Sequence, residues 1–97
     1  MSTYRVSKKA QSDIRSIAHY TQEQWGAAQR RKYLESLEGK FRQLADMPLM
    51  AAERKDLEPP VRIHRHERHL IVYMVIEDGI LIIRVRHHSE DWENNPT

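Results

Sequence analysis

The chain has 97 residues, of which 39% are hydrophobic and 31% are charged. This composition excludes an integral membrane protein and is too apolar for a fully disordered chain, and the length fits a single domain over residues 1–97. Because the chain has no cysteine, it has no disulfides, thiolate zinc sites or thiol nucleophiles. No apolar stretch follows the first charged residues, so we expect no secretory signal and a cytoplasmic protein.

Charge is distributed unevenly, although the net charge is only +2. Residues 1–47 carry nine basic and five acidic side chains, whereas the tail from Ser89 onward carries only acidic ones. Five of the six histidines lie within residues 61–88. This gradient fits an anionic partner, either an acidic peptide or a nucleic acid; an ordinary solvated surface is the alternative.

The first half of the chain predicts a short strand followed by two helices. Residues 4–6 fit a strand, and Ser7 is a candidate N-cap for the helix that follows. Apolar positions then recur every three or four residues up to Trp25, which we expect to be buried, and Gly26 fits a helix C-terminus. A second helix over residues 27–47 carries its own apolar stripe and forms an antiparallel hairpin with the first.

The second half changes to the period of two that is typical of strands. Pro48 ends the second helix, and a charged loop follows. Residues 61–64 alternate apolar and basic side chains, residues 70–76 are continuously apolar, and a turn at Asp78-Gly79 leads to a last strand over residues 80–85. The expected fold is α+β: a short N-terminal strand and an antiparallel helical hairpin packed on a small antiparallel β-sheet.

Basic residues cluster in the first and last strands of this expected meander. In the first, alternation separates a face with Arg62, His64 and His66 from a face with Val61, Ile63 and Arg65. In the last, it separates a face with Ile80, Ile82, Arg84, Arg86 and His88 from a face with Leu81, Ile83, Val85 and His87. Arg84 then emerges at the edge of a packed surface, where its guanidinium can bind a carboxylate or phosphate. The alternative is an internal ion pair with Asp78, Glu90 or Asp91.

The histidines admit three interpretations. His64 and His66 have the spacing to chelate zinc from one strand face, but the sequence offers no third ligand, so we predict no metal site. His87 or His88 can act as general acid or base in RNA cleavage, with nearby arginines stabilising phosphate charge. The third interpretation is packing and hydrogen bonding on a polar sheet face. The chain has no glycine-rich phosphate loop and no nucleophile elbow, and we predict no cofactor.

The order and spacing of these motifs resemble those of ParE toxins over nearly the whole chain. The residues that carry the resemblance are Tyr4-Arg5-Val6-Ser7, Ala10, Asp13-Ile14, Ile17, Tyr20, Trp25-Gly26, Tyr33, Leu37, Phe41, Leu44-Ala45, Pro48, Arg68-His69-Leu70-Ile71-Val72-Tyr73, Asp78-Gly79-Ile80, Ile82-Ile83-Arg84-Val85, His87 and Asp91-Trp92.

This resemblance implies the RelE/ParE toxin fold and a type II toxin–antitoxin role, with growth arrest and plasmid stabilisation as its outcomes. It implies a hetero-oligomeric complex with a cognate ParD-like antitoxin, whose ribbon-helix-helix domain alone contacts operator DNA. The implied target is DNA gyrase, inhibited without catalysis. The alternative, from the RelE branch, is ribosome-dependent mRNA cleavage by histidines and arginines on the sheet.

The resemblance and the clusters together give three sets of candidate residues. The candidates for target binding are Arg84, Arg86, His87, Asp91 and Trp92, with Trp92 alternatively capping the core. The ribonuclease alternative would use His87, His88, Arg84, Arg62 and His64. We expect a strand or helix of the antitoxin in a groove between helices and sheet, where the candidate contacts are Trp25, Tyr33, Leu37 and Arg65.

Overall fold

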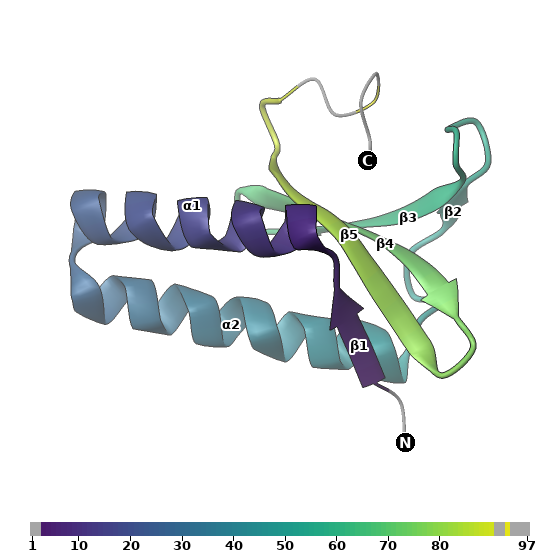
Figure 1. The fold of residues 1–97 in the computed structure, drawn as a ribbon, viewed down its shortest axis with the longest axis horizontal. Coiled ribbons are helices and arrows are strands. Elements are labelled where there is room, and N and C mark those ends of the chain that lie inside the picture. The colour runs from purple at the N-terminus through teal and green to yellow at the C-terminus, as the bar shows by residue number, and fades with distance from the viewer. Residues whose placement is uncertain (1–2, 91–92, 94–97) are drawn as a thin grey trace.

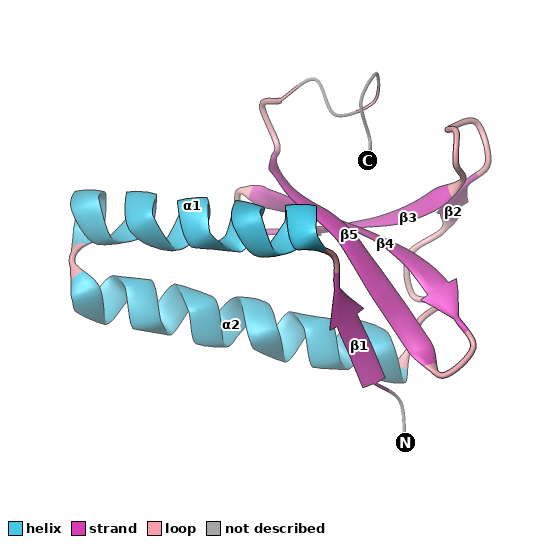
Figure 2. Ribbon diagram, viewed as in Figure 1, coloured by secondary structure: helices cyan, strands magenta, loops and turns pink. Residues whose placement is uncertain are grey.

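A computed structural model describes residues 3–90 and residue 93. Two helices form a hairpin on one side of a five-stranded sheet (Figure 1, Figure 2). The first elements of the chain are β1 (Thr3–Val6), α1 (Lys8–Trp25) and α2 (Ala27–Asp46). The strands that follow are β2 (Glu53–Arg54), β3 (Val61–His66), β4 (His69–Ile76) and β5 (Gly79–His87). The predicted α+β fold is confirmed.

Local signals set the boundaries of the helical hairpin. Ser7 Oγ accepts a hydrogen bond from the Ala10 amide at 3.0 Å, so Ser7 is the predicted N-cap of α1. Gly26 separates the two helices with a φ of +93°, which glycine adopts without a steric penalty. Its N–H donates to Gln22 O at 2.9 Å and closes the last turn of α1. A glycine alone therefore makes the reversal between the helices.

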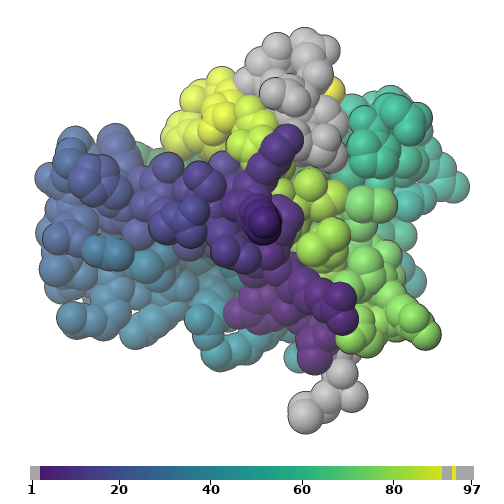
Figure 3. Space-filling view, in the orientation of Figure 1, coloured from purple at the N-terminus to yellow at the C-terminus, as the bar shows by residue number. Residues whose placement is uncertain are grey.

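The sheet has the strand order β1-β5-β4-β3-β2. Strands β3, β4 and β5 form the predicted antiparallel meander, while β1 pairs with β5 in parallel and makes the sheet mixed. Strand β1, purple in Figure 3, approaches β5 closely because Gly79 lies opposite Thr3, where a Cβ would come within 1.8 Å of Thr3 O. The two residues of β2 lie in the predicted loop and pair with the start of β3.

Most of the hydrophobic core lies between the helices and the sheet. Tyr73 is fully buried in it, and its hydroxyl donates to Pro48 O at 2.9 Å. The helices and β5 contribute the buried residues Ala10, Ile17, Leu37, Phe41, Leu44, Ala45, Ile80, Ile82 and Val85. A smaller cluster contains Leu57, Val61 and Val72, and since Val72 precedes Tyr73 in β4 it lies on the other face of the sheet.

Trp25 is exposed over 63% of its surface, so the prediction that it is buried is wrong. The helices extend past the end of the sheet (Figure 1), and the last turn of α1 has no strand beneath it. Helical periodicity places Trp25 on the same stripe as the buried Ile17 and Thr21, but it cannot show how far the sheet reaches.

A register shift in β5 overturns the predicted alternation of the last strand. Tyr73 of β4 pairs with Ile82, whereas the preceding residue, Val72, pairs with Arg84, so one residue of β5 is left over. This bulge changes the phase of the side chains. Val85 therefore shares the helix-side core with Ile82, and Arg84 does not follow Ile82 on that face.

Candidate functional site

A groove of about 740 Å³ opens between the helical hairpin and one end of the sheet. Its walls come from α1 and α2, from the turn between β3 and β4, and from the end of β5. The lining residues are Asp13, Ser16, Ile17, Tyr20, Thr21, Trp25, Gln29, Tyr33, Glu67, Arg68, His69, Val85, His87 and Glu90. The groove expected between helices and sheet is therefore present.

The helical wall of the groove carries two exposed aromatic side chains. Tyr20 is 59% exposed and Trp25 is 63% exposed, and the buried residues Ile17 and Thr21 of the same helix also line the groove. Large exposed aromatics next to an apolar floor are typical of protein-binding surfaces, because they bury much area with few rotatable bonds. This wall has the chemistry of a docking surface.

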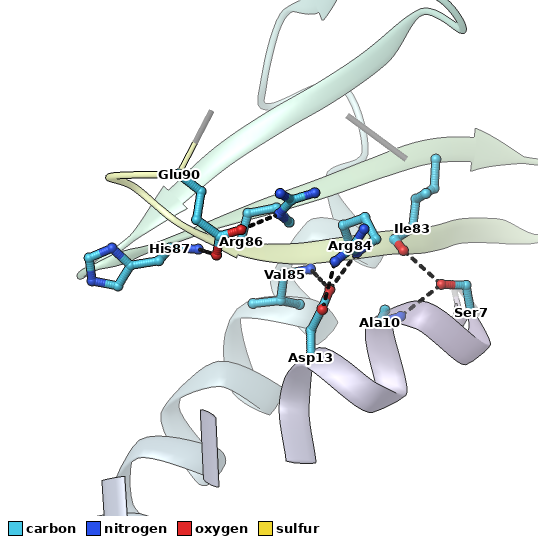
Figure 4. A network of polar contacts seen from close by, with 9 residues as sticks. All are labelled: Ser7, Ala10, Asp13, Ile83, Arg84, Val85, Arg86, His87 and Glu90. Carbon is cyan, nitrogen blue, oxygen red and sulfur yellow. Dashed lines mark hydrogen bonds and ion pairs between the residues drawn. The ribbon is translucent and has the colours of Figure 1, made fainter. Parts of the chain in front are cut away.

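Asp13 of α1, one of the residues that line the groove, anchors β5 through the contacts drawn in Figure 4. Its carboxylate accepts from Arg84 Nε at 2.7 Å and Nη2 at 2.9 Å, and from the Val85 amide at 2.9 Å. Ser7, the N-cap of α1, lies six residues earlier, and its Oγ donates to Ile83 O at 2.7 Å. Strand β1 reaches only as far as Ile82, so the side chains of Ser7 and Asp13 bond the outer edge of β5 beyond it.

Arg84 is thus internally paired, but not with any of the predicted partners. Asp78 lies beside Arg5 at 3.6 Å and Glu90 binds Arg86, while Asp91 lies outside the described residues. Arg84 is 71 positions from Asp13 in the sequence. The alternation of side chains within one strand gives no information about a partner this distant in sequence. The prediction of an Arg84 guanidinium available at the edge of a packed surface is wrong.

Glu90 makes a second anchor at the end of β5. Its carboxylate accepts from Arg86 Nε at 2.8 Å and from the His87 amide at 2.9 Å (Figure 4). Burial on its own raises the pKa of the Glu90 carboxyl, but these bonds outweigh it and the pKa is lowered. Arg86 is only 8% exposed, so its guanidinium is not presented at the surface as predicted.

A tyrosine–histidine pair closes the groove on the β3–β4 side. The Tyr33 hydroxyl of α2 lies 2.6 Å from His69 Nδ1, and burial raises the pKa of Tyr33 to about 12 and lowers the pKa of His69 to about 4. Next to this pair, Ser36 Oγ lies 2.7 Å from His66 Nε2, and burial also lowers the pKa of His66. These contacts tie the β3–β4 turn to α2 through neutral imidazoles.

The predicted ribonuclease residues are spread over the sheet. His87 lines the groove, and His88 is exposed and stacks on it with ring centres 4.6 Å apart. Arg62 instead donates to Ala51 O at 2.6 Å. His87 lies opposite His69 of β4, and Arg62 lies opposite Tyr73 of the same strand. His69 and Tyr73 are four residues apart, which is about 13 Å at the rise of a strand. His64 lies opposite Ile71, between these positions.

Only some of the predicted antitoxin contacts lie in the groove. Trp25 and Tyr33 line the groove. Leu37 is only 1% exposed and belongs to the core, so it offers no surface to a partner, and this choice is wrong. Arg65 is exposed outside the groove, where its Nε donates to Glu67 O. Trp92, a candidate for target binding, lies outside the described residues.

Sequence reasoning missed several groove residues. Tyr20 stands in the motifs that resemble the toxin family, which was the only signal for it, whereas His69 also belongs to the histidine cluster within residues 61–88. Asp13 gave no signal for its bond to β5, because its partners are distant in sequence. Over residues 3–90, together with residue 93, no three histidine or acidic side chains are placed to hold a metal ion. Across that same span, neither helix has the length and apolarity needed to cross a bilayer.

Comparison with known proteins gives a consistent result. The family model described as "ParE toxin of type II toxin-antitoxin system, parDE" matches residues 4–92. "Toxin ParE" of Escherichia coli is 30% identical over 92 residues, covering 94% of this chain and 89% of that protein. "Toxin ParE1" of Caulobacter vibrioides is 30% identical over 89 residues and covers 92% of each.

The fold is similar to that of a solved structure described as "Chromosomal ParDE TA system from P. aeruginosa". The TM-score is 0.76 at 20% sequence identity, and the match covers 90% of this chain and 96% of that one. At this identity the likeness concerns the fold alone.

Proposed function

The chain belongs to the ParE family of toxins from type II toxin–antitoxin systems, and from this membership we propose that a ParD-like antitoxin neutralises it and that the free toxin arrests growth by inhibiting DNA gyrase. The antitoxin carries a ribbon-helix-helix domain and forms a hetero-oligomeric complex with the toxin. Operator DNA is contacted by the antitoxin alone. The toxin acts in the cytoplasm as a single domain, where plasmid stabilisation would follow from growth arrest.

The groove supports the antitoxin half of this proposal. An apolar floor with exposed Tyr20 and Trp25 on one wall and polar groups on the other fits an amphipathic segment laid between helices and sheet. Trp25→Ala is expected to weaken neutralisation, because aromatic anchors carry much of the binding energy of such grooves. Leu49→Ala is the matched control, since Leu49 is 69% exposed and does not line the groove.

The neutralisation test is co-expression of the toxin with the antitoxin, with growth as the readout and co-purification as the check. Wild type and Leu49→Ala are expected to be neutralised equally, and Trp25→Ala to remain toxic. If Trp25→Ala is toxic alone and is still fully neutralised and co-purified, the groove is not where the antitoxin binds.

The pairing of the arginines supports inhibition by binding over ribonuclease catalysis. Arg84 is bonded to Asp13 and Arg86 to Glu90, so neither guanidinium is positioned to stabilise a phosphate. Within this proposal, His87 and the segment that follows it through Asp91 and Trp92 contact the target, and Arg84 positions them.

The target is tested by inducing the toxin without antitoxin and pulse-labelling DNA and protein synthesis side by side. Early arrest of DNA synthesis while translation continues is the expected result. Purified gyrase is then assayed for trapped cleaved DNA with wild-type toxin and with His87→Ala. Immediate loss of translation with shortened transcripts would instead assign the toxin to the ribonuclease alternative.

A further inference from the structure

The turn between β3 and β4 and the end of β5 together form a basic tip, which consists of Arg65, Arg68 and His88. All three residues are exposed. The backbone joins two of them directly, because the His88 N–H donates to Arg68 O at 2.9 Å. Desolvation lowers the pKa of His88 most, and the charges of Arg65, His87 and Arg68 lower it further, so both guanidiniums lie within electrostatic reach of the imidazole. The three residues therefore belong to one surface.

The two arginines of the basic tip are not paired with acidic side chains. Among residues 3–90 and residue 93, neither Arg65 nor Arg68 forms an ion pair. Arg65 Nε donates to Glu67 O at 2.9 Å, which orients the guanidinium and leaves its two Nη groups for a ligand. By contrast, carboxylates hold the guanidiniums of Arg5, Arg54, Arg84 and Arg86. The charge of the tip is therefore available to an external anion.

The carboxylates of Glu67 and Glu90 are directed to other groups near the tip. Glu67 belongs to the same turn, but its carboxylate lies 3.6 Å from the His66 imidazole. Glu90 accepts from Arg86 Nε at 2.8 Å and from the His87 amide at 2.9 Å. The tip therefore stays positive on balance.

The basic tip also lacks the apolar centre that a protein partner needs. The large apolar side chains that are exposed in the described part of the chain all lie elsewhere, and they are Tyr20, Trp25, Met47, Leu49, Met50 and Val75. Interfaces between proteins are centred on aromatic and apolar side chains, whereas phosphate groups are bound by charged and polar donors alone. The composition of the tip therefore favours a phosphate ligand over an acidic peptide.

We propose that the basic tip binds the sugar-phosphate backbone of the DNA that gyrase holds. This inference rests on the proposed gyrase target and adds DNA as a second contact of the toxin. The guanidiniums of Arg65 and Arg68 donate to phosphate oxygens, and the His88 imidazole donates a further hydrogen bond. His87, where the proposed target-binding segment begins, stacks on His88 with ring centres 4.6 Å apart. The toxin thus contacts the enzyme and its DNA through neighbouring residues.

The small number of contacts suits DNA that a third component already holds. Three phosphate contacts give weak and strongly salt-dependent binding to free DNA. In the gyrase complex the same contacts are intramolecular, and an effective concentration of about millimolar makes a weak contact effective. Arg68 also lines the groove, so an antitoxin segment bound there would cover part of the tip. This overlap agrees with operator DNA being contacted by the antitoxin alone.

The direct test is titration of a short duplex DNA into isotopically labelled toxin at low salt, followed by amide NMR shifts. The largest shifts are expected at Arg65, Arg68 and His88. The slope of log K against log salt concentration should fall by about two in the double variant Arg65→Gln/Arg68→Gln. Arg31→Gln/Lys32→Gln is the matched control, since it removes two exposed cations of α2 and should keep the wild-type slope. Shifts confined to other residues, or equal shifts with a glutamate peptide, would overturn the proposal.

The second test measures binding of the toxin to purified gyrase with and without bound DNA, after circular dichroism has shown that the variants are folded. Wild type and the control variant should bind more tightly when DNA is present. The double variant should lose that increase and bind DNA-free gyrase as wild type does. Equal binding of wild type with and without DNA would refute the role of the basic tip alone. No binding to gyrase in either form would refute the proposed target, and the DNA contact with it.

Discussion

Asp13 is expected to be the most sensitive polar position in the chain, because three hydrogen bonds between α1 and β5 end on its carboxylate. The side chains of Asp13 and Arg84 are 15% and 18% exposed. Removing one partner of a fully buried ion pair costs about 3–5 kcal/mol. Partial exposure reduces that cost, whereas the Val85 N–H left without an acceptor adds about 1 kcal/mol. We therefore expect Asp13→Ala to lower the free energy of unfolding by about 3 kcal/mol.

Arg84→Ala should be milder, at about 1–2 kcal/mol, because Asp13 still accepts from the Val85 amide. The double variant should cost less than the sum of the two single variants, with a coupling energy of about 1–2 kcal/mol. The assay is urea unfolding of the four proteins, followed by circular dichroism. Glu38 and Arg42 provide a control cycle, since they form an exposed ion pair within α2 whose coupling should stay below about 0.5 kcal/mol.

Two outcomes would refute this reasoning. If Asp13→Ala costs less than about 1 kcal/mol, the carboxylate does not compensate a buried charge as the geometry requires. If the effects of Asp13→Ala and Arg84→Ala simply add, the two residues are energetically independent despite their bidentate contact.

Three further predictions concern the sheet and its turns. Gly79→Ala should lower the melting temperature by about 10 °C, because the new Cβ would overlap Thr3 O and displace β1. The amide protons of β1 should also exchange faster in this variant. The pKa of His69 is near 4 in the folded chain and near 6.5 when unfolded, so the unfolded state binds the proton first as pH falls. The free energy of unfolding should therefore decrease by about 1–2 kcal/mol between pH 6.5 and pH 4, after discounting for solvent screening. Urea unfolding at stepped pH measures this decrease, and His69→Gln should make it smaller. Glu67→Asn should raise stability by about 0.5 kcal/mol in urea unfolding, because Glu67 has a φ of +54°, which asparagine tolerates better; an unchanged midpoint would show that the turn is not strained.

The elements that the sequence predicted well are those whose signals are local. Ser7 and Gly26 mark the helix boundaries by backbone chemistry confined to one turn, and the structure has both in their predicted roles. Residues 70–73 of the apolar run that becomes β4 are buried as expected of a central strand, whereas Val75 near its end is exposed. Such features depend on neighbouring residues only, and composition and period suffice to find them.

The features that could not be predicted depend on contacts between distant segments. The bulge opposite Val72 and Tyr73 leaves no mark in the composition of β5, yet it decides which face Arg84 and Val85 occupy. The bond from Asp13 to β5 joins residues more than 70 positions apart. The exposure of Trp25 depends on where the sheet ends beneath the helices. The family resemblance pointed to some of the groove residues, but the hydrogen bonds from Asp13 and Glu90 to β5 could not be predicted from the sequence.

The position of β5 in the sheet has a consequence for synthesis of the protein. Among the described residues, β5 is the last strand to be synthesised, yet β1, the first of these elements, pairs with it, and the side chains of Ser7 and Asp13 also bond to it. Until residues 79–87 have emerged, the nascent helical hairpin lacks the part of its core that Ile80, Ile82 and Val85 supply. A partner that binds before this point would therefore meet an incompletely folded chain.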